Sequence, residues 1–322
     1  MSVRFWEFAL VLVAVSWGGT FIPVQMSMAH IDVFSFLFWR FTLAAFFMWL
    51  FSLKFGIKFD KKSVIYGWIL GLMLLCDFAC QTYALNFTLS SSVAFVLGLN
   101  IVIVPFLLFV FLKKKISIFA VIGAITAFLG LYFLSGTGGL TLGFGESLTI
   151  ISAFMYALHI VFTGVYVSKT NIYALVVMQF VCVSVCSFFL AIFSNHQIYP
   201  NQITILNNLI FSPAPIVAFS LIITALVATV FAFFVQTLAQ RHVAPVKTVL
   251  IFALEPVSAG IIGYFFGENL SNLQIFGAIL ILTGILTSEL GDFVMKHFEF
   301  QVFKFRQKIV SNFRSKFKNK NR

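Results

Sequence analysis

The chain is a series of long apolar segments separated by short polar connections. Stretches of about 20 mostly apolar residues, enough to cross a bilayer as a helix, occur ten times. They cover roughly 6–28, 33–53, 64–86, 92–112, 117–135, 146–167, 172–193, 216–239, 244–266 and 273–291. The first is too long for a signal-peptide core, so we count it as a retained span. The pattern predicts an all-α polytopic membrane protein with ten transmembrane helices.

The ninth of these segments carries a charge near its middle. The run from Ala244 to Phe266 contains Glu255, followed directly by Pro256. A carboxylate at the bilayer centre costs several kcal/mol. The proline removes a backbone donor and frees the carbonyl of Phe252, one turn earlier. Because a lipid-facing helix gains nothing from either feature, we expect a helix that breaks at Pro256 and lines a polar cavity at mid-membrane.

Basic residues gather on one side of the predicted membrane. All 21 Lys and Arg residues except Arg40 lie in alternate connections or near the two chain ends. The intervening connections, 29–32, 87–91, 136–145, 194–215 and 267–272, contain none. Since the basic side of a membrane protein faces the cytoplasm, we expect both termini there. The expected location is the plasma membrane, which for a bacterium is the inner membrane.

Composition supports the membrane assignment and limits the other classes. The 322 residues are 61% hydrophobic and 10% charged, against about 45–50% and about 25% in soluble domains. The one-sided placement of basic residues accounts for the net charge of +11, so we expect no nucleic-acid partner. The cysteine pairs Cys76/Cys80 and Cys182/Cys186 have helical i,i+4 spacing, which favours packing; a thiolate metal site between two helices is the alternative. No cofactor or metal is expected.

The stretch after residue 291 has a different character. Apolar residues recur at three- and four-residue steps among Lys and Arg, at Phe298, Val302, Phe305, Ile309 and Phe313. This spacing predicts an amphipathic basic helix on anionic inner-leaflet lipid. A partly disordered tail that only fixes topology is the alternative.

The chain also repeats itself, with a period near 155 residues. The sequence Gln-Thr-Tyr-Ala at 81–84 matches Gln-Thr-Leu-Ala at 236–239. Glycines follow the same period, with Gly123 and Gly130 matching Gly277 and Gly284 to within one residue. Each half then holds five spans, and because five is odd the halves must insert in opposite orientations.

In this register Asn100 of the fourth span corresponds to Glu255 of the ninth. A buried amide and a buried carboxylate related by a pseudo-two-fold axis again indicate a polar site near the midplane. We therefore expect two inverted five-helix repeats, over 1–136 and 137–291, followed by a cytoplasmic tail over 292–322.

Short motifs in both halves carry a family resemblance. In the first half they are Trp17-Gly18-Gly19-Thr20, Arg40-Phe41, Ala94-Phe95, Asn100 and Pro105. In the second half they are Gln236-Thr237, Ala239-Gln240-Arg241, Leu254-Glu255-Pro256-Val257, Gly267-Glu268 and Gly277. Their order and spacing over residues 1–291 resemble EamA-type members of the drug/metabolite transporter superfamily. The resemblance implies ten helices, two five-helix repeats, a central cavity, and export or exchange of small metabolites.

The sequence departs from the family pattern at two places, and these departures leave the expected fold unchanged but do not identify the substrate subgroup. Lys113–Lys115 stand where many members have Gly-Glu, and Pro105 lies about one turn later than in the commonest pattern. Glu268 stands at the outer end of a span, where a solvated helix cap is the default interpretation.

Polar side chains fall at one depth in several spans. At the helical rise of about 1.5 Å per residue, Arg40, Asp77, Asn100 and Glu255 lie roughly 16–20 Å from the cytoplasmic ends of their helices. Because buried charges persist when they are paired or face water, we expect Arg40 to pair with Asp77 or Glu255.

The candidate substrate-binding or cavity residues are Trp17, Arg40, Asp77, Gln81, Tyr83, Asn100, Tyr156, His159, Gln236 and Glu255. Each has a structural alternative: an ion pair for the charged residues, packing for the aromatic ones, and helix–helix hydrogen bonding for the amides. Arg40 suits an anionic substrate group. His159 has the chemistry of a proton relay, with a hydrogen-bonded packing role as the alternative.

The leading hypothesis is a secondary transporter that moves a small organic metabolite, such as an amino acid, by alternating access. A lipid flippase or scramblase on the same scaffold is one alternative. An intramembrane enzyme is the other, but the chain has no His-Glu-x-x-His, Gly-x-Ser-x-Gly or Gly-x-Gly-Asp motif. The expected partners are the small-molecule substrate and the lipid bilayer, and a homodimer is left open.

Overall fold

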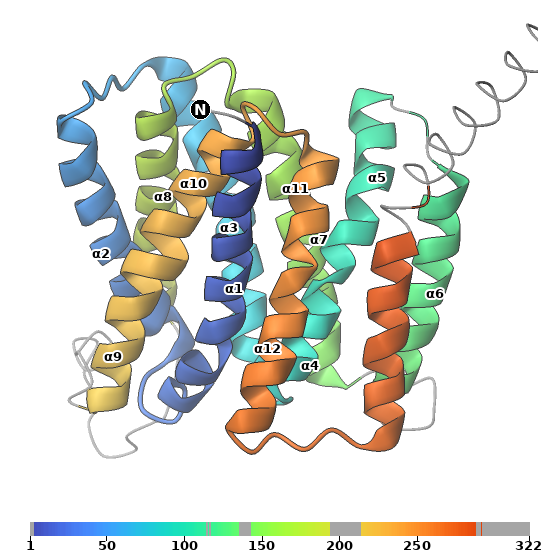
Figure 1. Cartoon of the computed structure of the whole chain (residues 1–322). Coiled ribbons are helices and arrows are strands. Elements are labelled where there is room, and N and C mark those ends of the chain that lie inside the picture. The colour runs from blue at the N-terminus through green and yellow to red at the C-terminus, as the bar shows by residue number, and fades with distance from the viewer. Residues whose placement is uncertain are drawn as a thin grey trace, which may run out of the picture.

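Helices are the only regular structure in the described residues of this computed structural model, namely 3–113, 115, 117–134, 143–193, 214–287 and 291. They form a bundle of roughly parallel rods (Figure 1). The predicted tail helix over 292–322 lies outside the described residues.

The described helices of the first half are α1 (Val3–Ser27), α2 (Val33–Leu53), α3 (Lys61–Ala84), α4 (Ser90–Leu97), α5 (Leu99–Leu112) and α6 (Ile118–Leu134). Those of the second half are α7 (Phe144–Tyr166), α8 (Ile172–Phe193), α9 (Pro215–Ile223), the π-helical η2 (Thr224–Phe231), α10 (Ala232–Ala239), α11 (Pro245–Phe252), α12 (Leu254–Phe265) and a final helix, Asn272–Thr287.

Eight of the predicted spans are helical segments of membrane-spanning length and apolarity in the described part of the chain. The fourth combines α4 and α5, the eighth runs from α9 through η2 to α10, and the ninth combines α11 and α12. The fifth and tenth spans, α6 and Asn272–Thr287, are shorter apolar helices. The prediction of an all-helical, polytopic membrane fold is confirmed.

Two spans are interrupted at matching positions. A turn at Gly98 separates α4 from α5, and a turn at Ala253 separates α11 from α12, 155 residues later (253 − 98). Asn100 and Glu255 each lie two residues beyond these turns. The break in the ninth span therefore precedes Pro256, which was the predicted position. The physical reason is that proline is tolerated in the first turn of a helix, where its missing N–H has no intrahelical partner.

The halves of the chain pack on each other in a symmetric manner. α1 contacts η2, α10 and α12 of the second half, as α7 contacts α3, α4 and α5 of the first. α2 and α8, the second span of each half, form the most extensive helix pair.

The halves also run in opposite directions. α1 begins on the face of the bundle where Lys247 pairs with Glu7. α7 begins on the other face, where Gly145 packs on Thr88 in the connection that follows α3. This inversion agrees with the odd number of spans in each half.

The fifth and tenth spans pack through glycines at the matched positions. A Cβ built on Gly277 would lie 2.6 Å from the carbonyl oxygen of Gly130, and one on Gly284 would lie 2.6 Å from that of Gly123. Small residues let helix backbones approach closely in a membrane, where packing rather than the hydrophobic effect drives helix association.

Replacing Gly277 with alanine should push these two helices apart, because the added Cβ would meet the Gly130 carbonyl. We expect a loss of about 1–3 kcal/mol in stability, measured as a lower thermal unfolding midpoint of the detergent-purified protein. Gly19→Ala is the control, since its Cβ would meet the Cδ1 atom of Ile262 at an ordinary 3.6 Å. Equal midpoints for the two variants would contradict this packing role.

Candidate functional site

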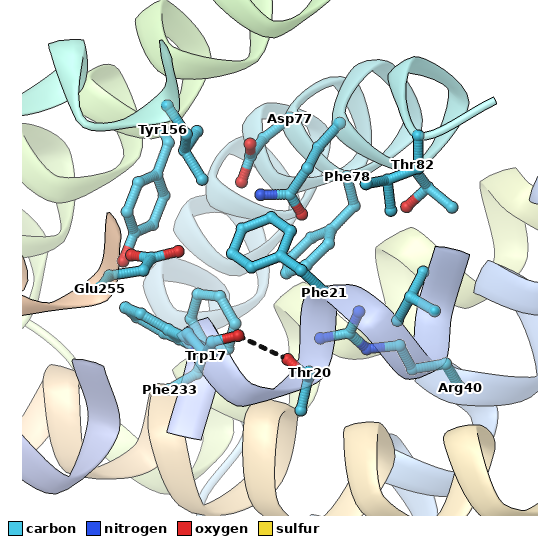
Figure 2. A pocket seen from close by; sticks show the side chains of 14 residues that line it. Trp17, Thr20, Phe21, Arg40, Asp77, Phe78, Thr82, Tyr156, Phe233 and Glu255 are labelled. Atoms are coloured by element: carbon cyan, nitrogen blue, oxygen red, sulfur yellow. Dashed lines mark hydrogen bonds between the residues drawn. The ribbon is translucent and has the colours of Figure 1, made fainter. Parts of the chain in front are cut away.

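A small cavity of about 40 Å³ lies inside the bundle against the interrupted ninth span. It is lined by Trp17, Thr20, Phe21, Val24, Arg40, Asp77, Phe78, Gln81, Thr82, Leu85, Leu97, Tyr156, Phe233 and Glu255 (Figure 2). Most of these residues come from α1 and from α3 and its C-cap. Pockets that hold small molecules measure roughly 300–1,000 Å³. This conformation therefore has room for water-sized groups but not for a whole metabolite.

Glu255 reaches the cavity from the first turn of α12 and is only 5% exposed. Among the described residues its carboxylate has no hydrogen bond and no ion pair; Ser258 bonds only to its backbone carbonyl, at 2.9 Å. The positive end of the helix dipole favours a carboxylate at this position. A buried carboxylate without a partner is nevertheless costly, so the site fits a group that brings a positive charge or a hydrogen-bond donor.

Asp77 brings a second carboxylate to the cavity from the middle of α3. Its side chain is 3% exposed and accepts a 2.5 Å hydrogen bond from the hydroxyl of Ser152 on α7. The bond spans the two halves of the chain, because α3 belongs to the first and α7 to the second. It satisfies one oxygen of the carboxylate and fixes the direction of the other.

Arg40 supplies the positive charge from α2 and is 4% exposed. Its Nε donates to the hydroxyl of Thr229 at 2.9 Å, and its guanidinium lies 4.4 Å from the ring centroid of Phe78. The predicted ion pair with Asp77 or Glu255 is wrong, since no such pair within 4.0 Å is present among the described residues. The hydroxyl and the cation–π contact hold the guanidinium in place of a carboxylate.

The charged groups stand apart around an aromatic space. Figure 2 shows Glu255 beside Tyr156 and Trp17 at one end of the cavity and Arg40 at the other. The Trp17 ring lies 5.8 Å from that of Tyr156 and 4.9 Å from that of Phe252, measured between centroids. The cavity thus combines two acidic groups, one guanidinium and several aromatic faces within a small volume.

The π-helical segment η2 contributes to this arrangement from the eighth span. The indole N–H of Trp17 donates to the carbonyl of Ala228 at 2.8 Å, and the next residue, Thr229, binds Arg40. A π-helix leaves backbone groups displaced from the regular ladder, and such segments occur frequently at functional sites. Here η2 fixes one aromatic and one cationic side chain of the first half.

Of the residues predicted for the site, six line the cavity: Trp17, Arg40, Asp77, Gln81, Tyr156 and Glu255. Four do not. Gln236 accepts a 3.2 Å bond from the Tyr156 hydroxyl, and His159 bonds through Nε2 to Gln179 at 2.8 Å. Asn100 is buried beyond the turn in the fourth span, and Tyr83 packs on Phe87 near the end of α3.

Sequence reasoning missed the apolar and hydroxyl part of the lining, namely Thr20, Phe21, Val24, Phe78, Thr82, Leu85, Leu97 and Phe233. The chain has 44 phenylalanines, so composition could not single out the three that line the cavity. Phe78 and Thr82 directly follow the predicted residues Asp77 and Gln81, and Thr20 ends the Trp-Gly-Gly-Thr motif that begins at the predicted Trp17. That adjacency is the one signal that could have found them.

Glu268 differs from its predicted role as a solvated cap. Its carboxylate accepts from the backbone N–H and the hydroxyl of Ser90, at 2.8 and 2.6 Å, and from the N–H of Ser91 at 3.1 Å. Glu268 therefore caps α4 rather than its own helix, and it ties the fourth span to the connection after the ninth.

The described residues contain no group of three or more His, Cys, Asp or Glu side chains arranged to hold a metal ion. All four cysteines are free thiols in this structure.

Comparison with known proteins agrees with this architecture. The EamA-like transporter family matches residues 4–136 and again residues 143–289. An uncharacterized transporter of Archaeoglobus fulgidus is 28% identical over 281 residues, covering 87% of this chain and 84% of its own. The uncharacterized transporter YyaM of Bacillus subtilis is 24% identical over 282 residues, covering 84% and 89%.

A solved crystal structure superimposes with a TM-score of 0.64 at 15% identity, covering 90% of this chain and 96% of that one, and so shares its fold. The family matches span nearly all of both halves. The chain is therefore an integral membrane protein that belongs to the EamA-like transporter family.

Proposed function

We propose that this protein is a secondary transporter that moves a small organic solute, such as an amino acid or a related metabolite, across the membrane by alternating access. The observation that carries the proposal is the unpartnered carboxylate of Glu255, buried in a cavity at the break of a spanning helix. Discontinuous helices at a repeat interface are where secondary transporters place their substrate sites.

The charges around the cavity suit a solute that carries both signs. The carboxylates of Glu255 and Asp77 would receive an ammonium group, and the guanidinium of Arg40 would receive a carboxylate. Phe21 and Phe78, which lie between these ends in Figure 2, would contact the apolar part. Because the present volume is too small for such a molecule, binding requires the helices to separate.

Alternating access would occur by movement of the half over 1–136 against the half over 137–291. Hydrogen bonds tie the halves together at both faces of the bundle. On one face Glu268 holds Ser90 and Ser91; on the other, the backbone N–H of Asn171 donates to the hydroxyl of Ser63 at 3.2 Å. Breaking one set at a time would open the cavity to one side only. We place the basic face, that of Arg241, in the cytoplasm by the positive-inside rule.

The lipid flippase alternative receives less support. A second, largely apolar groove of about 560 Å³ lies between α4, α12 and Asn272–Thr287. Within the described residues it shares no lining side chain with the central cavity. The groove thus gives a lipid headgroup no route to the charged residues.

Glu255→Gln should lower solute flux at least roughly tenfold, because a neutral amide cannot replace the charge that receives the ammonium group. The measurement is exchange of a panel of labelled amino acids in proteoliposomes, compared with protein-free liposomes. Glu7→Gln is the matched control, since Glu7 forms a partly exposed ion pair with Lys247 and such pairs contribute little. Transport that is equal in both variants would remove Glu255 from the mechanism. Failure of every panel member to move would refute the substrate class.

Proton coupling through Glu255 is a separate prediction. If its carboxylate carries a proton during the return step, an imposed pH gradient should drive solute accumulation in the unaltered protein. The same gradient should have no effect on the residual flux of Glu255→Gln. Accumulation is followed with a labelled solute, and internal pH with an entrapped dye. Solute flux that moves no protons and ignores the gradient would exclude coupling.

A further inference from the structure

In the structure, matched residues of the two halves are separated by two different sequence offsets, one for the first two spans of each half and one for the spans that follow. Asp32 caps α2 and Asn171 caps the start of α8, each by accepting from an N–H in the first turn, and they are 139 residues apart (171 − 32). The rings of Phe41 and Phe180, also 139 apart, meet at 5.8 Å. Matched residues that touch lie on the pseudo-two-fold axis, so this offset relates α1 and α2 to α7 and α8.

The spans that follow keep the longer offset of 155 residues. Phe78 and Phe233, which differ by 155, meet at 5.9 Å between ring centroids. The connection before α9 is longer than the one before α3, and this accounts for the change of register. Each cavity-lining position of the first half can now be assigned its mate in the second.

Five of the eleven mates form one group of side chains. The cavity residues Thr20, Val24, Arg40, Gln81 and Leu85 correspond, in that order, to His159, Thr163, Gln179, Gln236 and Gln240. We call the second group the polar seam. It lies between α7, α8 and α10, and its residues are all at most 6% exposed.

Every member of the polar seam has a buried polar atom without a hydrogen-bond partner. The atoms are Nδ1 of His159, Oγ1 of Thr163, Nε2 of Gln179, Nε2 of Gln236 and Oε1 of Gln240. Such atoms are rare in folded proteins and carry a desolvation cost. Their coincidence with the mates of the cavity lining indicates a place where water or solute binds in another conformation.

The seam is bridged by side chains over its length. The amide of Gln240 donates to the carbonyl of Ile160 at 3.0 Å, and His159 bonds to Gln179 at 2.8 Å. At its end Arg241 holds Val167 and Thr170 with bonds of 3.2–3.3 Å. These contacts close the seam toward the basic face. The cavity of the first half is oriented the opposite way, because Thr20 and Val24 follow Trp17 along α1 toward the other face.

We infer that the polar seam is a second solute-binding chamber, closed in this structure, which opens to the basic face when the cavity lined by the first half closes. The inference rests on the proposed alternating access, and it adds that α7, α8 and α10 separate from one another within the second half.

The chemistry of the chamber differs from that of the cavity. Gln179 replaces Arg40, while Thr163 and Gln240 replace the apolar Val24 and Leu85. The chamber therefore binds uncharged polar groups through hydrogen bonds, without a guanidinium to retain an anionic group. On the basic face the solute would lose its contact with Arg40 and be released more readily.

Thiol labelling tests this chamber without any transported solute. In a background with Cys76, Cys80, Cys182 and Cys186 replaced by alanine, Thr163→Cys introduces a thiol of nearly the same size as the hydroxyl it replaces. The probe is a charged, membrane-impermeant methanethiosulfonate applied to sealed vesicles of each orientation. Lys62→Cys, exposed on the basic face, reports which preparation presents that face.

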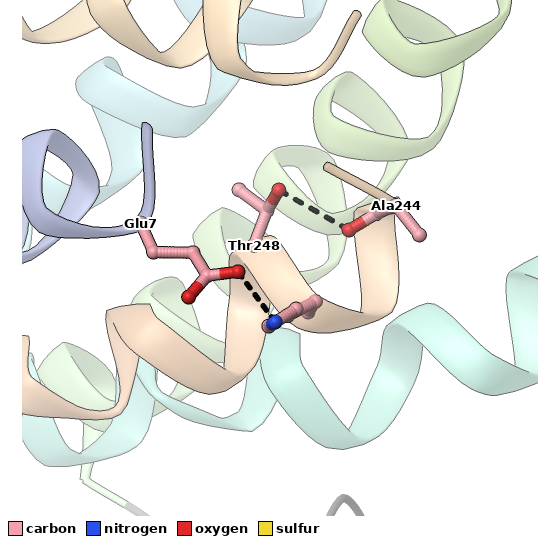
Figure 3. Close-up of polar contacts among 4 residues, drawn as sticks. Glu7, Ala244 and Thr248 are labelled. Carbon is pink, nitrogen blue, oxygen red and sulfur yellow. Dashed lines mark hydrogen bonds and ion pairs between the residues drawn. The ribbon is translucent and has the colours of Figure 1, made fainter. Parts of the chain in front are cut away.

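Thr248→Cys is the matched control (Figure 3). Thr248 is also 0% exposed and lies near the same face, beside the Lys247–Glu7 pair, but its hydroxyl is satisfied by the carbonyl of Ala244 at 3.3 Å. Its first-half mate, Val93, does not line the cavity. All variants must elute as a single folded species before labelling. Gln240→Cys provides a second seam position if Thr163→Cys does not fold.

We expect the seam thiol to react from the basic face at least roughly tenfold faster than Thr248→Cys. Adding Arg241→Ala should raise that rate by roughly a further tenfold, because it removes charge-assisted bonds that hold the seam closed, and should leave Thr248→Cys unchanged. Equal rates for seam and control thiols, or a seam thiol that does not react, would overturn the chamber. Seam labelling in a protein that moves no solute would refute the proposed function while leaving the chamber in place.

Discussion

The buried carboxylate of Glu255 is the constraint around which the structure is arranged. Inside a bilayer no water is available to satisfy a charge, so the protein must supply compensation or leave a binding opportunity. The turn at Ala253 starts a new helix whose positive end lies at this carboxylate. The side chain itself is left without a partner, while Asp77 and Arg40 are held by Ser152 and Thr229. A carboxylate without a partner, next to two charged groups that are fixed by hydrogen bonds, suits the reversible binding of a solute.

Internal symmetry would let one scaffold carry the two proposed sites, which differ in chemistry. The repeats share helix caps, glycine contacts and helix breaks, all of which act through the backbone. Their polar side chains have diverged, since Arg40 of the first half has Gln179 as its mate. Backbone geometry is thus common to both halves, whereas the charged side chains of the cavity are not repeated, since Asp77 and Glu255 have Ala232 and Asn100 as their mates. Such asymmetry suits a carrier that must bind on one face and release on the other.

The spans and their order could be predicted because the bilayer imposes them directly. A helix must remain apolar for about 20 residues to cross the hydrocarbon core, so the length of each apolar run predicts its span. The shorter fifth and tenth spans were found in the same way. The break near Pro256 was predictable to within a few residues, because proline alters the hydrogen-bond ladder wherever it occurs. The offset of the first two spans was not, since it is recognised only from the matching helix caps of Asp32 and Asn171 and from the contact between Phe41 and Phe180.

The sequence by itself determined which residues lie within the membrane and at what depth, since apolar length and helical rise place Arg40, Asp77 and Glu255 in one layer. Only the tertiary structure decided what each of them meets. Depth does not specify rotation about the helix axis or the choice among several neighbours, so opposite charges at one level suggested an ion pair that is not formed. Packing of α2 against η2 gave Arg40 a threonine and an aromatic ring instead. The unsatisfied atoms of the polar seam are likewise a product of packing, because an atom lacks a partner only once the surrounding helices are in place.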